Sequence, residues 1–283
     1  MTKIALYIFS ISLFISTLIS CNNEHKVEPK EYSLHILAHR GTGRQMQIID
    51  NDTIFENTLA AVKYGFTHFD GVETDIQMSK SGTIWLFHND ELLCLDTLNP
   101  MCIPNSTDDE ILEHNKHLPS WRRLCTLEQV ISYQSKQVDI KYISLDVKGY
   151  FKNTCIKGRN ISNEYMLDIA HKIILLAKKY NTENYTLVET DYREVLNTIK
   201  DESTNIECYL LGYSNFTDKM NYAIKKGYDG LSFNMNDSSL TAKNIEQLHN
   251  NNLKIQIWTV NVSSKKPIAL KLGADFIQSD VVF

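Results

Sequence analysis

Seven side chains of types that can do chemistry stand at or just after short apolar runs in this 283-residue sequence. They are His39, Arg40, Glu73, Asp75, His88, Asp146 and Lys148. The three carboxylates offer the oxygen ligands that Mg2+ and Ca2+ take, rather than the Cys and His ligands typical of zinc. The two imidazoles can act as an acid and base pair, and Arg with Lys attracts an anion. We therefore predict a cation site at Glu73, Asp75 and Asp146, flanked by the two histidines and the two basic side chains.

This set of groups matches the cleavage of a phosphodiester. A cation and basic side chains can offset the charge that develops on phosphoryl oxygens. One imidazole can deprotonate the attacking hydroxyl while the other protonates the leaving alkoxide, and the sequence does not distinguish the two roles. Each motif alone is a weak signal, because a solvated strand end or turn often carries the same residues. The prediction therefore depends on a fold that brings the motifs together.

The elements that must do so follow a repeating strand and helix pattern. Short apolar runs predict strands at 34–39, 71–77, 142–147, 185–189, 206–211, 229–233, 254–260 and 275–279. Helical patterns between them predict helices at about 55–65, 126–135, 162–180, 192–201, 217–226, 241–251 and 263–272. Eight strands joined by seven helices without a linker favour one α/β domain, a (β/α)8 TIM barrel over residues 33–283. The carboxyl ends of its strands would meet at one face, where the active sites of such barrels lie.

Residues 83–88 form an additional predicted strand. It follows the strand at 71–77 after a connection too short for a parallel crossover, so the two must form an antiparallel hairpin extension. A turn centred on Lys80-Ser81 places His88 opposite Glu73.

Residues 91–123 are predicted to form a long insertion loop on the face where the strands end. Such a loop usually shapes substrate access, and the alternative is a surface excursion without a role in specificity.

Seven motifs follow one another in order along the chain. They are His39-Arg40-Gly41, Glu56-Asn57-Thr58, Gly71-Val72-Glu73-Thr74-Asp75, Gly82 to His88, Leu145-Asp146-Val147-Lys148, Ile257-Trp258-Thr259-Val260-Asn261 and Gly273-Ala274-Asp275-Phe276-Ile277. In this order they resemble the motifs of the glycerophosphodiester phosphodiesterases, over residues 36–280. The resemblance implies a (β/α)8 barrel, a divalent cation, Ca2+ or Mg2+, and hydrolysis of deacylated phospholipids to glycerol 3-phosphate and an alcohol. It also implies metal ligands at Glu73 and Asp75, an acid and base pair at His39 and His88, and phosphate binding by Arg40 and Lys148.

The sequence departs from that family's pattern at four places. Phe55 stands where the family has Pro, and Asn89 follows His88 where Asp is usual. Near Glu189 the family usually has Ser-Phe, which leaves the substrate open. Asp146 stands where Glu is usual, and its carboxylate reaches roughly 1.5 Å less far. We therefore predict a preference for Ca2+, or Mg2+ held through water at Asp146, unless its strand lies closer to the barrel axis.

Glu56, Glu189 and Trp258 are further candidates for the pocket. Thr53 to Glu56 also has the pattern of a capping box at the start of the helix at 55–65, so Glu56 either supports that start or forms a hydrogen bond in the site. Trp258 either walls the substrate pocket or packs at the barrel rim.

Residues 1–20 have the pattern of a lipoprotein signal peptide. Lys3 is followed by an uncharged apolar stretch, which is shorter than the ~20 apolar residues of a spanning helix. The stretch ends in Leu18-Ile19-Ser20-Cys21, which resembles a bacterial lipobox, where the Cys thiol is diacylated. We predict lipidation at Cys21, a tether over 21–32 and attachment to the bacterial cell envelope, on the periplasmic or cell-surface side. An ordinary secretory signal that contains a cysteine is the alternative.

The composition excludes several classes of protein. With 43% hydrophobic residues and only 11 Gly and 5 Pro, the chain is neither disordered nor collagen-like. A formal charge of -5 without a cluster of Lys and Arg argues against nucleic acid as a partner.

Five cysteines follow Cys21, namely Cys94, Cys102, Cys125, Cys155 and Cys208. An odd number leaves at least one free thiol. A Cys94–Cys102 disulfide is possible in an oxidising compartment, and burial as small apolar residues is the alternative for all five.

Three functions are compatible with these features. The leading one is an exported, lipid-anchored, metal-dependent phosphodiesterase acting on small glycerophosphodiesters. The second is a phospholipase-like enzyme that attacks the head groups of lyso- or intact phospholipids, with acyl chains under residues 91–123. The third is a surface lipoprotein that binds phosphorylated ligands or sugars without turnover, and the pair of histidines argues against it.

Overall fold

The computed structural model describes residues 33–43, 46–49, 52–92, 101–149, 155 and 163–283. The predicted signal peptide, the tether and Cys21 lie outside these residues. Within the described ranges, no helix has the length and apolar character needed to cross a membrane.

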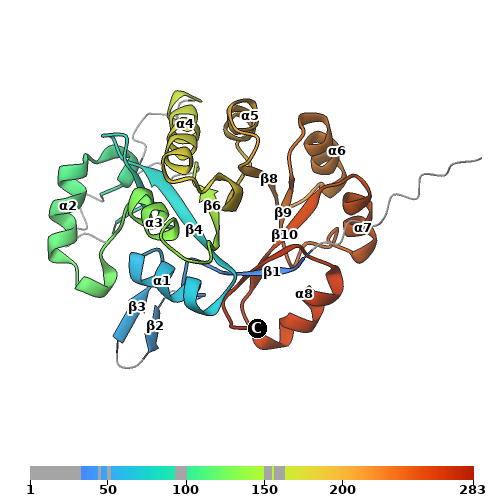
Figure 1. Cartoon of the computed structure of the whole chain (residues 1–283), viewed down its shortest axis with the longest axis horizontal. Helices are drawn as coiled ribbons and strands as arrows, with labels where there is room; N and C mark the ends of the chain where they lie inside the picture. Colours follow the sequence, from blue (N-terminus) through green and yellow to red (C-terminus); the bar gives the residue numbers. More distant parts are fainter. Residues whose placement is uncertain (1–32, 44–45, 50–51, 93–100, 150–154, 156–162) are drawn as a thin grey trace, which may run out of the picture. The chain divides into compact units, whose positions relative to one another are not determined.

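Eight parallel strands of the described chain close into a barrel, as predicted (Figure 1). In pairing order they are β1 (His35–Ala38), β4 (Gly71–Met78), β6 (Tyr142–Val147), β7 (Thr186–Thr190), β8 (Glu207–Gly212), β9 (Gly230–Asn234), β10 (Lys254–Val260) and β11 (Phe276–Ser279). Strand β1 pairs with both β11 and β4, and this closes the sheet. The strands are apolar because the barrel interior covers one face and the helices cover the other.

Helices connect the strands and surround the barrel (Figure 1). They are α1 (Leu59–His68), α3 (Leu127–Gln134), α4 (Asn163–Tyr180), α5 (Arg193–Glu202), α6 (Phe216–Lys226), α7 (Ala242–Asn250) and α8 (Lys266–Leu272), with short 3-10 turns at Glu183–Tyr185 and Ser263–Lys265. Helix α4 illustrates the pattern, because Met166, Ile169, Ile173 and Ala177 recur three or four residues apart and are all buried. Both α6 and α8 end at a glycine with left-handed backbone.

The return strand β5 (Ile84–Leu86) pairs antiparallel with β4, as predicted, but in a different register. Leu86 lies opposite Ile76, so the prediction that His88 lies opposite Glu73 is wrong by one residue. The turn has three residues rather than two, because Ser79 N–H bonds to Thr83 O and Gly82 adopts a left-handed backbone with φ 82°. A left-handed glycine after two turn residues is a common way to add one residue to a hairpin.

The insertion after β5 is a folded subregion where the sequence predicted a long loop. It contains a bridge between Leu92 and Met101, a 3-10 turn (Ile103–Asn105), helix α2 (Asp108–His117) and a second 3-10 turn (Ser120–Arg122). Thr107 and Glu110 form a capping box at the start of α2. The insertion has its own apolar cluster, in which Ile103 and Ile111 pack with Trp85 of β5.

The chain before α1 also differs from the prediction. Strands β2 (Met46–Ile49) and β3 (Asp52–Phe55) form an antiparallel hairpin that the sequence analysis did not predict. Thr53 and Phe55 therefore belong to a strand, and the predicted capping box at Thr53 to Glu56 is wrong. The helix begins instead after Thr58, whose side chain accepts a hydrogen bond from Ala61 N–H.

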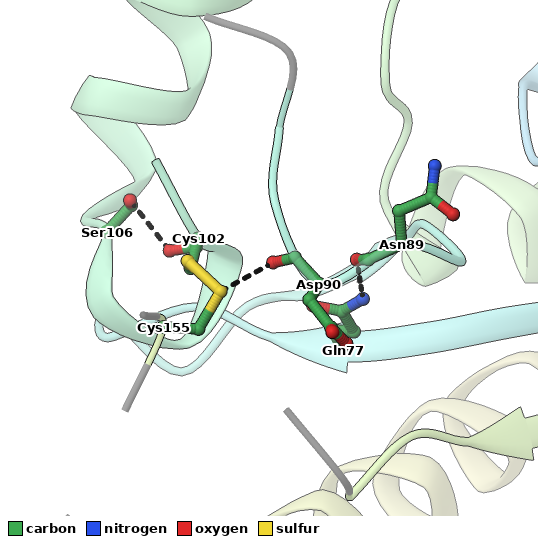
Figure 2. The surroundings of a disulfide bond; sticks show 6 residues. All are labelled: Gln77, Asn89, Asp90, Cys102, Ser106 and Cys155. Atoms are coloured by element: carbon green, nitrogen blue, oxygen red, sulfur yellow. Dashed lines mark hydrogen bonds between the residues drawn. A yellow bond between two sulfur atoms is a disulfide. The ribbon is translucent and has the colours of Figure 1, made fainter. Parts of the chain in front are cut away.

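One disulfide joins Cys102 in the insertion to Cys155 in the connection between β6 and α4 (Figure 2). This pairing rules out the Cys94–Cys102 disulfide considered above, and it overturns burial as free thiols for Cys102 and Cys155. Cys125 and Cys208 are buried and free, as expected for small apolar residues. Cys94 lies outside the described residues.

Candidate active site

An open pocket lies at the carboxyl ends of the barrel strands. Nine of the predicted residues line it, namely His39, Arg40, Glu73, Asp75, His88, Asp146, Lys148, Glu189 and Trp258. Glu56 contacts the pocket indirectly, through Arg40. Tyr213 and Gln278 also line the pocket, and the sequence analysis did not single them out.

The turn after β1 sets the positions of His39 and Arg40. Arg40 has a left-handed backbone with φ 55°, and its main-chain N–H donates to Glu73 Oε2 at 2.9 Å. Gly41 follows with φ 83°, and a Cβ there would lie 2.8 Å from the main chain of Ala61. Only glycine fits both constraints, which explains why His-Arg is followed by Gly at this turn.

His39 is oriented by a carboxylate that the sequence analysis missed. Its Nδ1 lies 2.7 Å from Asp280 Oδ1, just beyond the end of β11. An ionised carboxylate can only accept, so Nδ1 carries the proton and Nε2 faces the pocket, 3.9 Å from Glu73 Oε2. The available signal was the position of Asp280 at the end of a predicted barrel strand, where polar residues reach the active face.

His88 lies just beyond β5 and is held by a buried glutamine of β4. The Gln77 side-chain amide donates to the main-chain oxygens of Phe87 at 2.9 Å and Asn89 at 2.8 Å, on either side of His88 (Figure 2 shows the second bond). His88 Nδ1 is 2.9 Å from the Asn89 side-chain oxygen. Gln77 thus fixes the segment that carries the second predicted catalytic histidine.

The two basic side chains are shared among the carboxylates. Lys148 Nζ lies 2.9 Å from Asp75 Oδ1 and 2.6 Å from Asp146 Oδ2. Arg40 lies 2.9 Å from Glu56 and 3.5 Å from Asp75. Burial opposes ionisation of Asp75, but Lys148, His88 and Arg40 outweigh it and lower the pKa of Asp75.

The Glu56-Asn57-Thr58 motif holds two of the pocket residues, Arg40 and Asp75, by hydrogen bonds. Glu56 binds the Arg40 guanidinium, and Thr58 caps α1. Asn57 forms two hydrogen bonds with Asp75, from its side-chain amide to Oδ2 at 2.8 Å and from Asp75 N–H to its side-chain oxygen at 3.0 Å. Of the two roles considered for Glu56, the structure places it beside Arg40 and not in a capping box.

Three carboxylates of the pocket form a compact cluster. One oxygen each from Glu73, Asp146 and Glu189 lies within 4.8 Å of the others. Burial, with Asp75 and Glu189 nearby, raises the pKa of Glu73 well above its ordinary value. Burial and Asp146 raise the pKa of Glu189 to about 8, and burial also raises the pKa of Asp146. In the described pocket the carboxylates outnumber Arg40 and Lys148, so this oxygen cluster suits a divalent cation.

Glu189 is also tied to the barrel interior. Its Oε2 accepts from the Ser232 hydroxyl and, at 2.7 Å, from Gln256 Nε2, and its Oε1 accepts from Gln278 Nε2 at 2.5 Å. These donors come from β9, β10 and β11. Because all three are neutral, they orient the carboxylate without balancing its charge.

Trp258 lines the pocket, which is the first of the two alternatives predicted for it. It packs edge to face against Tyr213, with ring centroids 5.4 Å apart. A second, mainly apolar pocket adjoins His88, and its walls come from the insertion, from Phe55, Phe87 and Leu124, and from the Glu56-Asn57-Thr58 motif.

Comparisons with known proteins show the family of this chain. Residues 39–282 match the model of the Glycerophosphoryl diester phosphodiesterase family. A curated glycerophosphodiester phosphodiesterase from Caldanaerobacter subterraneus subsp. tengcongensis is 23% identical over 252 residues, covering 87% of this chain and 93% of that protein.

Two solved structures share the fold. A structure described as a putative glycerophosphoryl diester phosphodiesterase from Silicibacter pomeroyi has a TM-score of 0.71 and 15% identity, covering 89% of this chain and 91% of that one. A phosphodiesterase from Oleispira antarctica, in complex with the product sn-glycerol-3-phosphate, has a TM-score of 0.65 and 19% identity, covering 87% and 93%.

Proposed function

The chain belongs to the glycerophosphoryl diester phosphodiesterase family, and we propose that it hydrolyses glycerophosphodiesters to glycerol 3-phosphate and an alcohol with a divalent cation. We base this proposal on one observation: two histidines, Arg40, Lys148 and an acidic cluster line the same pocket. The named homologues are phosphoric diester hydrolases, one of them solved with the proposed product.

The histidines supply the proton transfers in this proposal. His39 presents Nε2 to the pocket because Asp280 holds its Nδ1. His88 is held on another side of the same pocket by Gln77. One imidazole takes the proton of the attacking hydroxyl and the other gives a proton to the leaving alkoxide.

The charged side chains hold the phosphate. Lys148 and Arg40 face the pocket and can each turn one donor toward a phosphate oxygen while they stay near Asp75. Glu73, Asp75 and Asp146 are the proposed cation ligands. A bound divalent cation would act as a Lewis acid that offsets charge on the phosphoryl oxygens.

Export and lipid attachment to the cell envelope are part of the same proposal. The lipobox-like ending at Cys21 supports them. The Cys102–Cys155 disulfide also supports export, because disulfides persist mainly in oxidising compartments.

The proposal is tested with the purified full-length chain and a panel of glycerophosphodiesters that differ in their alcohol. Release of glycerol 3-phosphate is measured with added Ca2+ or Mg2+, and after exhaustive chelation. We expect product with at least one substrate, lost on chelation and restored by a divalent cation. Full activity after chelation contradicts the cation, and binding without product with any substrate favours a non-catalytic role.

The apolar hollow beside His88 does not favour the phospholipase-like alternative. Phe87, Leu92, Leu118 and Leu124 line it, together with Arg122, and its volume of about 20 Å³ holds a water molecule rather than an acyl chain. We therefore expect slower hydrolysis of lysophosphatidylcholine than of glycerophosphocholine, and the opposite order would support the phospholipase-like alternative.

A further inference from the structure

We propose that Glu189 is an additional ligand of the divalent cation, and that it compensates for the short reach of Asp146. This inference rests on the proposed function and names one more residue of that site. Three observations carry it: the position of Glu189, the absence of a cationic partner for it in the described chain, and the bonds that orient it.

The position of Glu189 follows from strand register. Asp75, Asp146 and Glu189 lie side by side on β4, β6 and β7. The oxygens of Glu73, Asp146 and Glu189 lie within 4.8 Å of one another. Two oxygens on opposite sides of one Ca2+ are ~4.6 to 5.2 Å apart, against ~4.0 to 4.2 Å for Mg2+. None of the three separations exceeds the span of two oxygens across one Ca2+, so one ion can contact all three side chains.

The distribution of positive charge leaves Glu189 available for a cation. Asp75 has both Lys148 and Arg40, and Asp146 shares Lys148. Among the described residues no Lys, Arg or His forms an ion pair with Glu189, although its side chain is 1% exposed. A buried carboxylate without a counter-charge is costly, and a cation removes that cost.

The hydrogen bonds to Glu189 fix the orientation of its carboxylate. In metal sites, residues around the ligands orient them by hydrogen bonds in the same way. Ser232 and Gln256 donate to Oε2 and Gln278 donates to Oε1, and all three donors are neutral. A second buried polar oxygen lies on the neighbouring strand β6. Ser144 pairs in register with Glu73, and among the described residues its hydroxyl has no hydrogen-bond partner. A pre-oriented carboxylate loses little freedom when it binds an ion.

The compensation follows from side-chain length. Asp146 is one methylene shorter than the Glu that the family pattern usually has there, and Glu189 stands on the neighbouring strand at the same level. Glu189 is one methylene longer than Asp146 and can reach the space that a longer residue at 146 would fill. The carboxylates at positions 146 and 189 together then supply the cation with the oxygen ligands that one Glu at position 146 supplies in the family pattern.

The first experiment measures Ca2+ binding by calorimetry on the full-length chain without substrate. Glu189→Gln is expected to weaken Ca2+ binding by about tenfold or more, as Glu73→Gln should. Asp275→Asn is the matched control, because Asp275 is a carboxyl group of similar burial placed before β11, at the opposite end of the barrel. Its Ca2+ affinity should equal that of the wild type. Unchanged affinity in Glu189→Gln overturns the ligand role.

A structural role for Glu189 gives a different result. In that case Glu189→Gln lowers the melting temperature of the metal-free chain and leaves the Ca2+ affinity as it was. We expect instead that the Ca2+ affinity falls, whatever Glu189→Gln does to the melting temperature of the metal-free chain. The increase in melting temperature on adding Ca2+ should be smaller in the variant.

The second experiment tests the compensation. The double variant Asp146→Glu with Glu189→Gln places the longer carboxylate on β6 and removes the one on β7. We expect its Ca2+ affinity to return to near the wild-type value. If Glu189→Gln alone binds Ca2+ weakly and the double variant binds it no more tightly, Glu189 does not compensate for the shorter side chain of Asp146.

Failure of this inference can be separated from failure of the proposed function. If the wild type hydrolyses glycerophosphodiesters, and Glu73→Gln weakens Ca2+ binding while Glu189→Gln does not, Glu189 is not a ligand and the proposed function stands. If the wild type neither binds a divalent cation nor forms product, the proposed function fails, and this inference fails with it.

Discussion

At the scale of single residues, the pocket is organised by sharing of charge. Lys148 lies between Asp75 and Asp146, and Arg40 between Glu56 and Asp75. Each basic side chain is thus held in place before any phosphate arrives, which lowers the entropic cost of binding one. The same sharing keeps Asp75 ionised, so part of the acidic pocket is charged even without a cation.

Both pocket histidines are expected to be essential. Replacing His39 or His88 by Ala should lower kcat by about 100- to 10,000-fold, because departure of an alkoxide needs a proton donor and attack needs a base. Steady-state hydrolysis of a glycerophosphodiester measures the effect. His171→Ala in α4 is the control, because this exposed histidine pairs with Glu202 on the surface. Near-wild-type turnover in either pocket variant refutes the pairing.

A comparison of leaving groups then separates the two roles. The variant that lacks the acid should recover most of its rate with a substrate whose alcohol is a good leaving group. The variant that lacks the base should not.

Asp280 is expected to act as a positioning residue for His39. Asp280→Asn keeps the size and one acceptor oxygen but removes the charge that holds Nδ1–H. We expect kcat to fall by about 10- to 100-fold with little change in KM or melting temperature. A loss of activity that follows a loss of folded protein, or a change confined to KM, contradicts this role.

Most of the residues that line the pocket could be predicted from the sequence, but some of the residues that position them could not. The predicted residues stand at strand ends, where the two-residue period and the barrel rule bring them to one face. Asp280 was missed because its partner His39 is 241 positions away, and no local pattern connects them. The role of Glu189 depends on the register between β6 and β7, which the sequence does not state.

At the scale of elements, the strands were predictable and the turns were not. β6 and β10 have the predicted bounds, because apolar runs of strand length define them. The hairpin from β4 to β5 differs by one residue, since its turn length depends on the left-handed backbone of Gly82. Helix α2 was missed although Thr107 and Glu110 form a capping box, because its mostly polar sequence buries only Ile111 and Asn115.

Gln77 on β4 holds the main chain on either side of His88, so we expect it to position this histidine for catalysis. Gln77→Leu removes both bonds around His88 while it keeps a side chain of similar size. We expect kcat to fall by about tenfold or more, because a misplacement of 1 Å can cost about a hundredfold in rate. Gln137→Leu is the control, since the Gln137 side chain donates to Tyr133 O near the end of α3. Equal kcat in both variants shows that β4 does not position His88.

The disulfide is expected to stabilise the insertion against the barrel. Cys102 and Cys155 are separated by 53 residues, so the bond restricts a long loop of the unfolded chain. Replacing both by Ser should lower the free energy of unfolding by about 3 to 4 kcal/mol. Chemical denaturation of the oxidised wild type and the double variant measures this. An equal midpoint and slope in both proteins refutes the stabilising role.

At the scale of the whole molecule, the proposed lipid anchor would suit an enzyme whose substrates are released at a membrane. The barrel carries the pocket on one face, and residues 22–32 separate it from Cys21 in the sequence. An acyl anchor contributes ~0.8 kcal/mol for each buried CH2, so a diacylated cysteine would hold the chain at a bilayer without a spanning helix.

Cys21→Ala tests the anchor. In a bacterial host with lipoprotein processing, the wild type should partition into the detergent phase and lose residues 1–20, because diacylation at Cys21 precedes cleavage. The variant should appear in the aqueous phase or keep its signal peptide, as phase separation and intact mass will show. Cys94→Ala is the matched control, since it removes a thiol that follows no lipobox-like sequence, and it should partition as the wild type does. An unchanged mass and detergent partition in Cys21→Ala would mean that another feature of the chain holds it at the membrane.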